Sequence, residues 1–341
     1  MGEYLKNRLD IKSQALYQRI VEAGTKQLES VDCSGLSDEE IVTAYASVLS
    51  DHPELFFLSQ SFKIQETTGS FGVRKQLFVE RIFSKEQIAC YQIALKDARK
   101  EIAEKARNCK TEKEKEKKVC EYVVGRVTYA IDNKYNQNAA VALVGGIGQC
   151  SGISKAVKYL LDSLGIECWV VSGEATNTVE TGRHAWNIVK IDGKYYHLDV
   201  TFMAGAGGGV FCNRYFNYTD EQISEDHKWE RSCYPICSAK TNRAPRISEA
   251  PPTPIAAIKG NERPSEKVIS NYFTFRYEIG KVYEGKGTRL VFSSKLREIF
   301  GKPIVDTLIA EALAVAKEKN VAVSVNAKMQ KYIVTLNVIW K

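Results

Sequence analysis

A cysteine, a histidine and an aspartate follow one another along this chain, each in a setting suited to nucleophilic catalysis. Cys150, His184 and Asp199 lie, respectively, in GQCSG at 148–152, RHAWN at 183–187 and HLDVT at 197–201. A thiol activated by an imidazole that a carboxylate orients is an acyl-transfer centre found on unrelated folds. The types and order of these residues predict a cysteine nucleophile that attacks a carbonyl carbon.

The residues after Cys150 predict a helix whose first turn holds the thiol. Apolar residues recur at three- and four-residue spacing at Ile153, Val157, Leu160, Leu161 and Leu164. Gly165 is suited to the position just beyond the last turn. Free N–H groups and the macrodipole at a helix start stabilise a thiolate, lower its pKa and can stabilise an oxyanion.

A tight hairpin is expected to bring His184 and Asp199 together. Strand-like runs flank the dipeptide DG at 192–193, a strong signal for a two-residue turn. Such a turn pairs residues whose numbers sum to 385, as 192 and 193 do. His184 then becomes the diagonal neighbour of Asp199 on one face, about 7–8 Å away and within reach of a side chain. A slip of one residue would place the two on opposite faces.

Among the three other histidines, His197 is the alternative candidate for the base. His197 shares the predicted face with Asp199, and we expect a structural or supporting role for it. His52 and His227 lie in loop-like, polar contexts without a nearby nucleophile.

The nine cysteines are scattered and form no dense disulfide framework. Cys90, Cys109 and Cys120 fall in helical patterns with apolar neighbours and are interpreted as ordinary buried thiols. Cys233 and Cys237 are also given a structural interpretation. A disulfide or half of a metal site are the alternatives, although the spacing suits zinc poorly.

The elements before the predicted site are a helical pattern, a second helix, a hairpin and a long helix. Ser37 and Glu40 form a capping box before the second helix, and Ser84 caps the long one. Lys and Glu alternate at 110–118, which we interpret as a solvated helical face rather than a partner-binding patch. The expected spans are 4–29, 37–50, 55–65 with 72–83 for the hairpin, and 84–108.

Four prolines between 244 and 254 predict a linker, because proline is excluded from helix and sheet interiors. Strand-like runs at 268–282, 288–292, 321–325 and 332–340 and a helix-like run at 304–317 follow. The predicted domains are an N-terminal helical and hairpin extension (1–83), a catalytic core (84–243), a Pro-rich linker (244–262) and a small α+β module (263–341).

Composition excludes several classes of protein. With 44% hydrophobic and 26% charged residues, the 341-residue chain is an ordinary globular protein. The net charge of +7 is spread along the chain and does not predict nucleic-acid binding. No stretch reaches the ~20 apolar residues of a membrane span. The polar start predicts no signal peptide and hence a cytoplasmic protein, or an extracellular one if a leader has been trimmed.

The combined motifs resemble the transglutaminase-like superfamily, in particular its bacterial members. The likeness is strong over residues 80–237 and rests on GQCSG, HAWN and DGKYYHLDVT, with YFxxTDExIxxDHxW at 215–229 resembling the closing segment. It implies an α+β fold with a papain-like core, in which a helix carrying the cysteine packs on an antiparallel sheet carrying the histidine and the aspartate. The C-terminal module lies outside the resemblance.

The resemblance also implies roles for single residues. Cys150 is then the nucleophile, His184 the general base and acid, and Asp199 the residue that orients it. Oxyanion stabilisation uses the cysteine N–H and an upstream donor. The candidates for oxyanion stabilisation or substrate positioning are Gln137, Asn138, Gln149 and Trp186.

These expectations favour a thiol enzyme that forms a thioester from a peptide or protein amide and hydrolyses it, without a metal or cofactor. Animal-type transglutaminases carry a tryptophan where this chain has Ser151, which argues against glutamine–lysine crosslinking. Crosslinking remains an alternative, as does a non-catalytic binding module with the same fold. A third alternative is metal binding by Cys150, His184 and Asp199.

Overall fold

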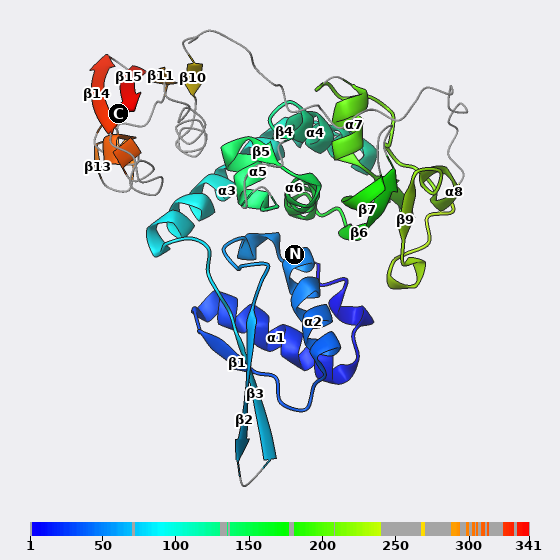
Figure 1. Cartoon of the computed structure of the whole chain (residues 1–341). Helices are drawn as coiled ribbons and strands as arrows, with labels where there is room; N and C mark the ends of the chain where they lie inside the picture. The colour runs from blue at the N-terminus through cyan, green and yellow to red at the C-terminus, as the bar shows by residue number, and fades with distance from the viewer. Residues whose placement is uncertain are drawn as a thin grey trace. The chain divides into compact units, whose positions relative to one another are not determined.

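The computed structural model of the chain divides into two compact units, residues 1–143 with 148–257 and residues 144–147 with 258–341 (Figure 1). No helix among its described residues is both long and apolar enough to span a membrane. The residues described are 2–69, 72–129, 135, 137–176, 181–207, 209–239, 267–269, 288–293, 298–299, 302–303, 305, 308–310, 312–313, 323–330 and 333–340.

The N-terminal part of the first unit combines helices with a three-stranded antiparallel sheet in the order β1-β3-β2. The capping box of Ser37 and Glu40 is present at the start of α2, as predicted. The hairpin is shorter than predicted, because Leu55 belongs to a 3-10 helix that begins at Pro53. The elements are η1 (Lys6–Arg8), α1 (Ile11–Lys26), β1 (Ser30–Asp32), α2 (Asp38–Asp51), η2 (Pro53–Leu55), β2 (Lys63–Gly69) and β3 (Gly72–Phe78).

The first residues of the chain connect the N-terminal part of the first unit to the helix that carries Cys150. Lys158 is fully buried, and its ammonium donates to Asp162 Oδ2 at 3.0 Å and to the Gly2 carbonyl at 3.4 Å. It also lies 4.5 Å from the ring centroid of Tyr4, which stacks on Trp169. The contacts of Lys158 with Gly2 and Tyr4 join segments more than 150 residues apart and hold the N-terminal helices against the core.

Two helices precede the core, α3 (Lys85–Ala106) and α4 (Glu112–Val124). Ser84 caps α3 as predicted, and both helices begin with a capping box, at Ser84 and at Thr111. Most lysines and glutamates of α4 lie on the solvated face, as expected, but Glu116 is fully buried. Asn217 Nδ2 donates a 2.8 Å hydrogen bond to its Oε2. Burial raises the pKa of Glu116 to about 8, although the bond from Asn217 and the charge of Lys113 act in the opposite direction.

Glu116→Gln is expected to stabilise the protein in alkali and to change little at pH 5. The folded pKa of about 8 exceeds the ordinary 4.5, so the wild type loses stability as the pH rises through that window. Glutamine does not ionise, so a gain on the order of a few kcal/mol at pH 9 should appear in urea unfolding. Glu104→Gln, on an exposed face, is the control; equal changes in both variants would contradict this account.

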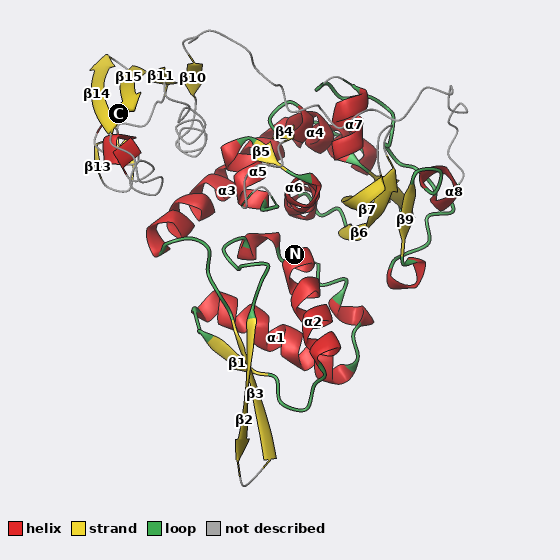
Figure 2. Ribbon diagram, viewed as in Figure 1, coloured by secondary structure: helices red, strands yellow, loops and turns green. Residues whose placement is uncertain are grey.

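The core is α+β, with a four-stranded sheet in the order β8-β7-β6-β9 in which every neighbouring pair is antiparallel (Figure 2). Helix α6 packs against β6 and β7. The elements are β4 (Thr128–Tyr129), α5 (Ala139–Gly145), β5 (Ile147–Gly148), α6 (Cys150–Ser163), β6 (Cys168–Thr176), β7 (Thr181–Ile191), β8 (Lys194–Leu198), α7 (Val200–Ala206), α8 (Asp220–Ile223), β9 (His227–Trp229) and η3 (Arg231–Cys233).

The register of the β7–β8 hairpin is the predicted one. Asn187 pairs with Leu198 and Ile191 with Lys194, so paired numbers sum to 385. Asp192 and Gly193 both have positive φ, 49° and 76°, as a type I′ turn requires. The turn therefore fixes which face of the sheet each later residue occupies.

The second unit contains a four-stranded sheet in the order β10-β11-β15-β14. Within it, β14 is longer than predicted and forms a hairpin with β15. Val305, 308–310 and 312–313 are helical within the predicted 304–317 run. The Pro-rich segment 244–262 lies outside the described residues, and the domain limits stay predictions. The strands are β10 (Lys267–Ile269), β11 (Thr288–Ser293), β12 (Glu298–Ile299), β13 (Lys302–Pro303), β14 (Val323–Gln330) and β15 (Ile333–Trp340).

Candidate active site

Cys150 is the first residue of α6, as the apolar periodicity predicts. Hydrogen bonds lock the first turns of this helix to the sheet. The Ser154 hydroxyl lies 2.7 Å from the Cys150 carbonyl and 2.9 Å from the Ala185 carbonyl on β7. The buried Asn187 amide donates to the carbonyls of Ser154 and Trp169, both at 3.0 Å. The thiol is therefore held in place relative to β7, the strand that carries His184.

His184 and Asp199 are in direct contact. His184 Nε2 lies 2.7 Å from Asp199 Oδ2, and both side chains are buried. Because Nε2 faces the carboxylate, Nδ1 is the nitrogen left for the hydrogen bond between His184 and the Cys150 thiol. Asp199 also caps α7, and its Oδ1 accepts from the Phe202 N–H at 3.0 Å. The carboxylate is thus fixed at a helix start, where its negative charge is favoured.

The electrostatics of the three groups favour a thiolate–imidazolium pair. Burial raises the pKa of the Cys150 thiol, but hydrogen bonding to His184, its charge and the Ala185 N–H bring that pKa below its ordinary value. Burial lowers the pKa of His184, whereas the charge and hydrogen bond of Asp199, with help from Cys150, raise it to about 10. Burial opposes ionisation of Asp199, yet His184 and His227 hold its pKa well below the usual range.

His227 is the participant that sequence reasoning missed. It was expected in a loop without a functional neighbour, but it lies in β9, fully buried, with Nε2 3.0 Å from Asp199 Oδ2. Its Nδ1 lies 2.6 Å from Asp226 Oδ1, and the Tyr215 hydroxyl donates to Asp226 Oδ2 at 2.7 Å. Both ring nitrogens face carboxylates, so His227 can donate to both as an imidazolium. Burial opposes this charge, but Asp199 and Asp226 raise the pKa of His227.

A glycine allows β9 to approach. In the pairing of β6 with β9, Gly173 lies opposite Trp229 and Ala175 opposite His227. A Cβ on Gly173 would lie 2.2 Å from the Lys228 carbonyl oxygen and 2.8 Å from the Trp186 ring. The DHxW motif at 226–229 signalled this segment, but a three-residue strand is too short to show periodicity.

Trp186 and His197 lie beneath the site. Trp186 is fully buried, its ring stacks on His184 with centroids 6.0 Å apart, and its Nε1 donates to His197 Nδ1 at 2.9 Å. His197 Nε2 in turn lies 2.8 Å from Asp220 Oδ1. These contacts orient the His184 ring from inside the core. A substrate-positioning role for Trp186 stays a prediction, and in this structure its side chain contacts the core.

Among the described residues, two groups of side chains have the composition of metal sites: His184 with Asp199 and His227, and His197 with Asp220 and Cys237. In the second group, Nδ1 of His197 accepts the Trp186 N–H, so the proton is on Nε2 and points at Asp220. That nitrogen has no lone pair for a metal. All nine cysteines are free thiols, so Cys233 and Cys237 form no disulfide.

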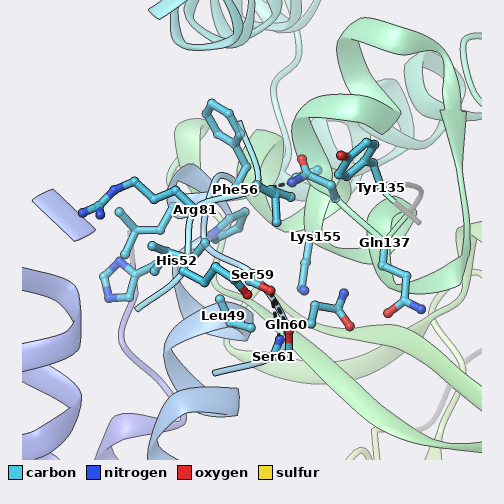
Figure 3. A pocket seen from close by; sticks show the side chains of 17 residues that line it. Leu49, His52, Phe56, Ser59, Gln60, Ser61, Arg81, Tyr135, Gln137 and Lys155 are labelled. Atoms are coloured by element: carbon cyan, nitrogen blue, oxygen red, sulfur yellow. Dashed lines mark hydrogen bonds between the residues drawn. The ribbon is translucent and has the colours of Figure 1, made fainter. Parts of the chain in front are cut away.

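The three upstream oxyanion candidates lie in different settings. Asn138 directly precedes α5; its Oδ1 accepts from the Ala140 N–H at 2.9 Å, and its amide donates to the Phe56 carbonyl. Gln149 precedes α6 in extended conformation, and its side chain does not cap the helix. Gln137 lines a cavity (Figure 3). A role of these three residues in oxyanion stabilisation stays a prediction. The side chain of Asn138 is already engaged in structural hydrogen bonds to the backbone.

Comparison with known proteins identifies the core. Residues 100–200, which include Cys150, His184 and Asp199, match the family model described as the transglutaminase-like superfamily. A search of curated proteins found no match.

Three solved structures show distant similarity. One, described as a TGase, is 16% identical with a TM-score of 0.30, and covers 49% of this chain and 48% of its own. A second, described as "a Putative Cysteine Protease from Cytophaga hutchinsonii", is 14% identical with a TM-score of 0.30, and covers 44% and 65%. A third, described as "a putative protease from Parabacteroides distasonis", is 8% identical with a TM-score of 0.28, and covers 83% and 62%. The chain thus spans less than two thirds of each.

Proposed function

We propose that this transglutaminase-like domain is a cysteine-dependent hydrolase that cleaves an amide or peptide bond through a thioester. The observation that carries the proposal is the hydrogen-bonded series Cys150–His184–Asp199. The Nε2 atom of His184 lies 2.7 Å from the buried Asp199 carboxylate. The other ring nitrogen, Nδ1, is available to the thiol of Cys150 at the start of α6. Order, burial and charge in this arrangement match what nucleophilic acyl transfer requires.

In the first half-reaction the Cys150 thiolate attacks the carbonyl carbon, forming a C–S bond and an oxyanion. Backbone N–H groups at the start of α6 are suited to stabilise that oxyanion. His184 gives its Nδ1 proton to the leaving nitrogen, the C–N bond breaks, and an amine departs. Asp199 keeps its charge throughout and holds the ring in the orientation that presents Nδ1 to the thiol.

In the second half-reaction neutral His184 takes a proton from water, and the resulting hydroxide attacks the thioester carbonyl. The C–S bond breaks, a carboxylic acid leaves, and the thiolate–imidazolium pair is restored. An amine in place of water would yield a new amide, so the acceptor decides between hydrolysis and crosslinking. Ser151, beside the nucleophile, is part of the sequence argument for water.

Cys150→Ala is expected to abolish turnover in a screen of peptide and protein mixtures, measured by mass spectrometry with and without a primary amine. Wild type should produce cleavage or a gain of about 1 Da per hydrolysed side-chain amide, because hydrolysis replaces the NH₂ group with OH and releases ammonia. Incorporation of the amine would instead identify a transglutaminase.

Two results would contradict the proposal. One is equal product from wild type and Cys150→Ala, which would place the chemistry elsewhere. The other is an unchanged biological effect of the alanine variant, which would favour a non-catalytic binding module. Ser232→Ala, an exposed change in η3 outside the triad, is the control for handling and folding.

A further inference from the structure

A cavity of about 660 Å³ lies between the N-terminal region and the helices of the core, within the first unit. Leucine, isoleucine and phenylalanine side chains line part of it, among them Leu49, Phe56 and Ile82. Serines and glutamines line the remainder, including Ser59, Ser61, Gln60 and Gln137. Its size lies in the range of pockets that bind small ligands or short peptide segments, and its mixture of apolar walls and a few polar groups is typical of them.

Lys155 is the unpaired cation of this cavity. Its side chain extends from α6 into the space toward Gln60 and Gln137 (Figure 3). It has no hydrogen-bond or ion-pair partner among the described residues, and the Gln137 amide likewise has none there. Burial lowers the pKa of Lys155 to about 8, while the charge of Cys150 acts in the opposite direction. An ammonium held in such a place without a counter-ion is suited to receive one from a ligand.

The other basic side chains in the lining, Arg81 and His52, have partners of their own. Arg81 donates through Nη2 to the carbonyls of Ala23 and Leu28, both at 3.1 Å. His52 Nδ1 lies 2.8 Å from Glu54 Oε1. Glu80 is the acidic residue in the lining, and no ion pair joins it to Lys155 within the described part of the chain. The positive charge that α6 offers to the cavity is that of Lys155, and Arg81 Nε is a second buried donor without a partner among the described residues.

Lys155 also lies near the nucleophile. It follows Cys150 by five residues on α6, which is roughly 7.5 Å along the axis at 1.5 Å per residue. The charge of Cys150 raises the pKa of Lys155, against the effect of burial, which agrees with this spacing. Cys150 is not in the cavity lining, and five residues at 3.6 per turn place the two side chains about 140° apart around α6. A peptide of several residues is therefore needed to reach both Lys155 and the thiol.

We propose that the cavity binds the segment of a peptide substrate next to the attacked bond, and that Lys155 selects a side chain ending in a carboxylate there. The proposal deepens the proposed function and rests on it for the identity of the ligand as a substrate. Apolar walls take the side-chain carbons, the serine and glutamine groups bond the peptide amides, and Lys155 pairs with the carboxylate.

Binding is tested without turnover, using the full-length Cys150→Ala protein at pH 6.5 and pools of acetylated hexapeptide amides. The peptides of a pool differ only in having Glu, Gln or Lys at one position. The peptides that the Cys150→Ala protein retains are quantified by mass spectrometry. Glu members are expected to be retained about 10- to 100-fold better than Gln members, the range for a hydrogen-bonded ion pair. Lys155→Met in this background should abolish the preference, and Lys155→Glu should shift it to Lys members.

Lys113→Met, which removes an exposed lysine of α4 outside the cavity lining, is the matched control and should keep the preference. Lys155→Gln is measured alongside, so that misfolding of one variant does not decide the result. Equal retention of Glu and Gln members, or a preference that survives loss of Lys155, overturns the proposal. If wild type cleaves peptides without favouring Glu, catalysis stands and the cavity proposal falls. If Lys155-dependent retention is seen but wild type modifies no peptide, the binding site stands and the catalytic proposal falls.

Discussion

Asp199→Asn is expected to lower kcat/KM for a cleaved peptide by about 10³- to 10⁴-fold, the loss typical when a triad aspartate becomes an amide. The carboxylate holds His184 Nε2 at 2.7 Å and supports its positive charge. An asparagine at this position removes that charge and can turn its N–H₂ toward the ring, favouring the wrong tautomer. The pKa of His184 should then fall, and Cys150 should lose the partner that keeps its thiol pKa low.

The same variant should change how the thiol titrates. In wild type, iodoacetamide should label Cys150 at neutral pH faster than the exposed Cys233, because the lowered pKa of the Cys150 thiol makes the thiolate available there. In Asp199→Asn, the midpoint of the labelling profile should move to higher pH. Asp97→Asn, which alters an exposed aspartate of α3 far along the chain from the triad, is the control. An unmoved midpoint in Asp199→Asn would show that the pair does not set the thiol pKa.

His227→Leu is expected to cost about 3–5 kcal/mol of unfolding free energy, as when one partner is removed from a buried ion pair. The imidazole lies between Asp199 and Asp226, whose side chains are 1% and 8% exposed, and leucine leaves both carboxylates without this donor. Urea unfolding followed by tryptophan fluorescence measures the loss.

The pH dependence of that loss has a definite sign. The folded pKa of His227 is raised above 6.5, so its contribution is fully present below the unfolded pKa and is lost as the pH rises through the folded one. The gap between wild type and His227→Leu should therefore shrink in alkali. His52→Leu is the control, because its imidazole is also buried but its hydrogen-bonded carboxylate, Glu54, is 38% exposed and stays in contact with solvent after the change, so the loss should be smaller. Equal losses in both variants would contradict a special role for His227.

Local interactions explain why much of this chain is predictable from its sequence. The capping boxes at Ser37, Ser84 and Thr111 each join residues three apart, and the structure contains all three. The apolar periodicity after Cys150 correctly predicts α6, and the Asp192–Gly193 dipeptide correctly predicts the hairpin register. Once that register is known, His184 and Asp199 must share a face, because strand side chains alternate.

Only the tertiary structure decided the contacts between residues that lie far apart along the chain. His227 comes 28 residues after Asp199, in a strand of three residues, and contacts it only because β9 pairs with β6 beside Gly173. Glu116 repeats the pattern of its exposed neighbours, yet it is buried because Asn217, 101 residues away, packs against it. In the sequence, Lys155 is an ordinary polar residue of a helix. In the structure, it lines a cavity together with residues of the N-terminal region. The sequence determines the interactions of groups whose partners lie within one turn or one hairpin. Burial and long-range contacts decide which charged groups are shielded from water, and therefore decide the pKa values and the chemistry of those groups.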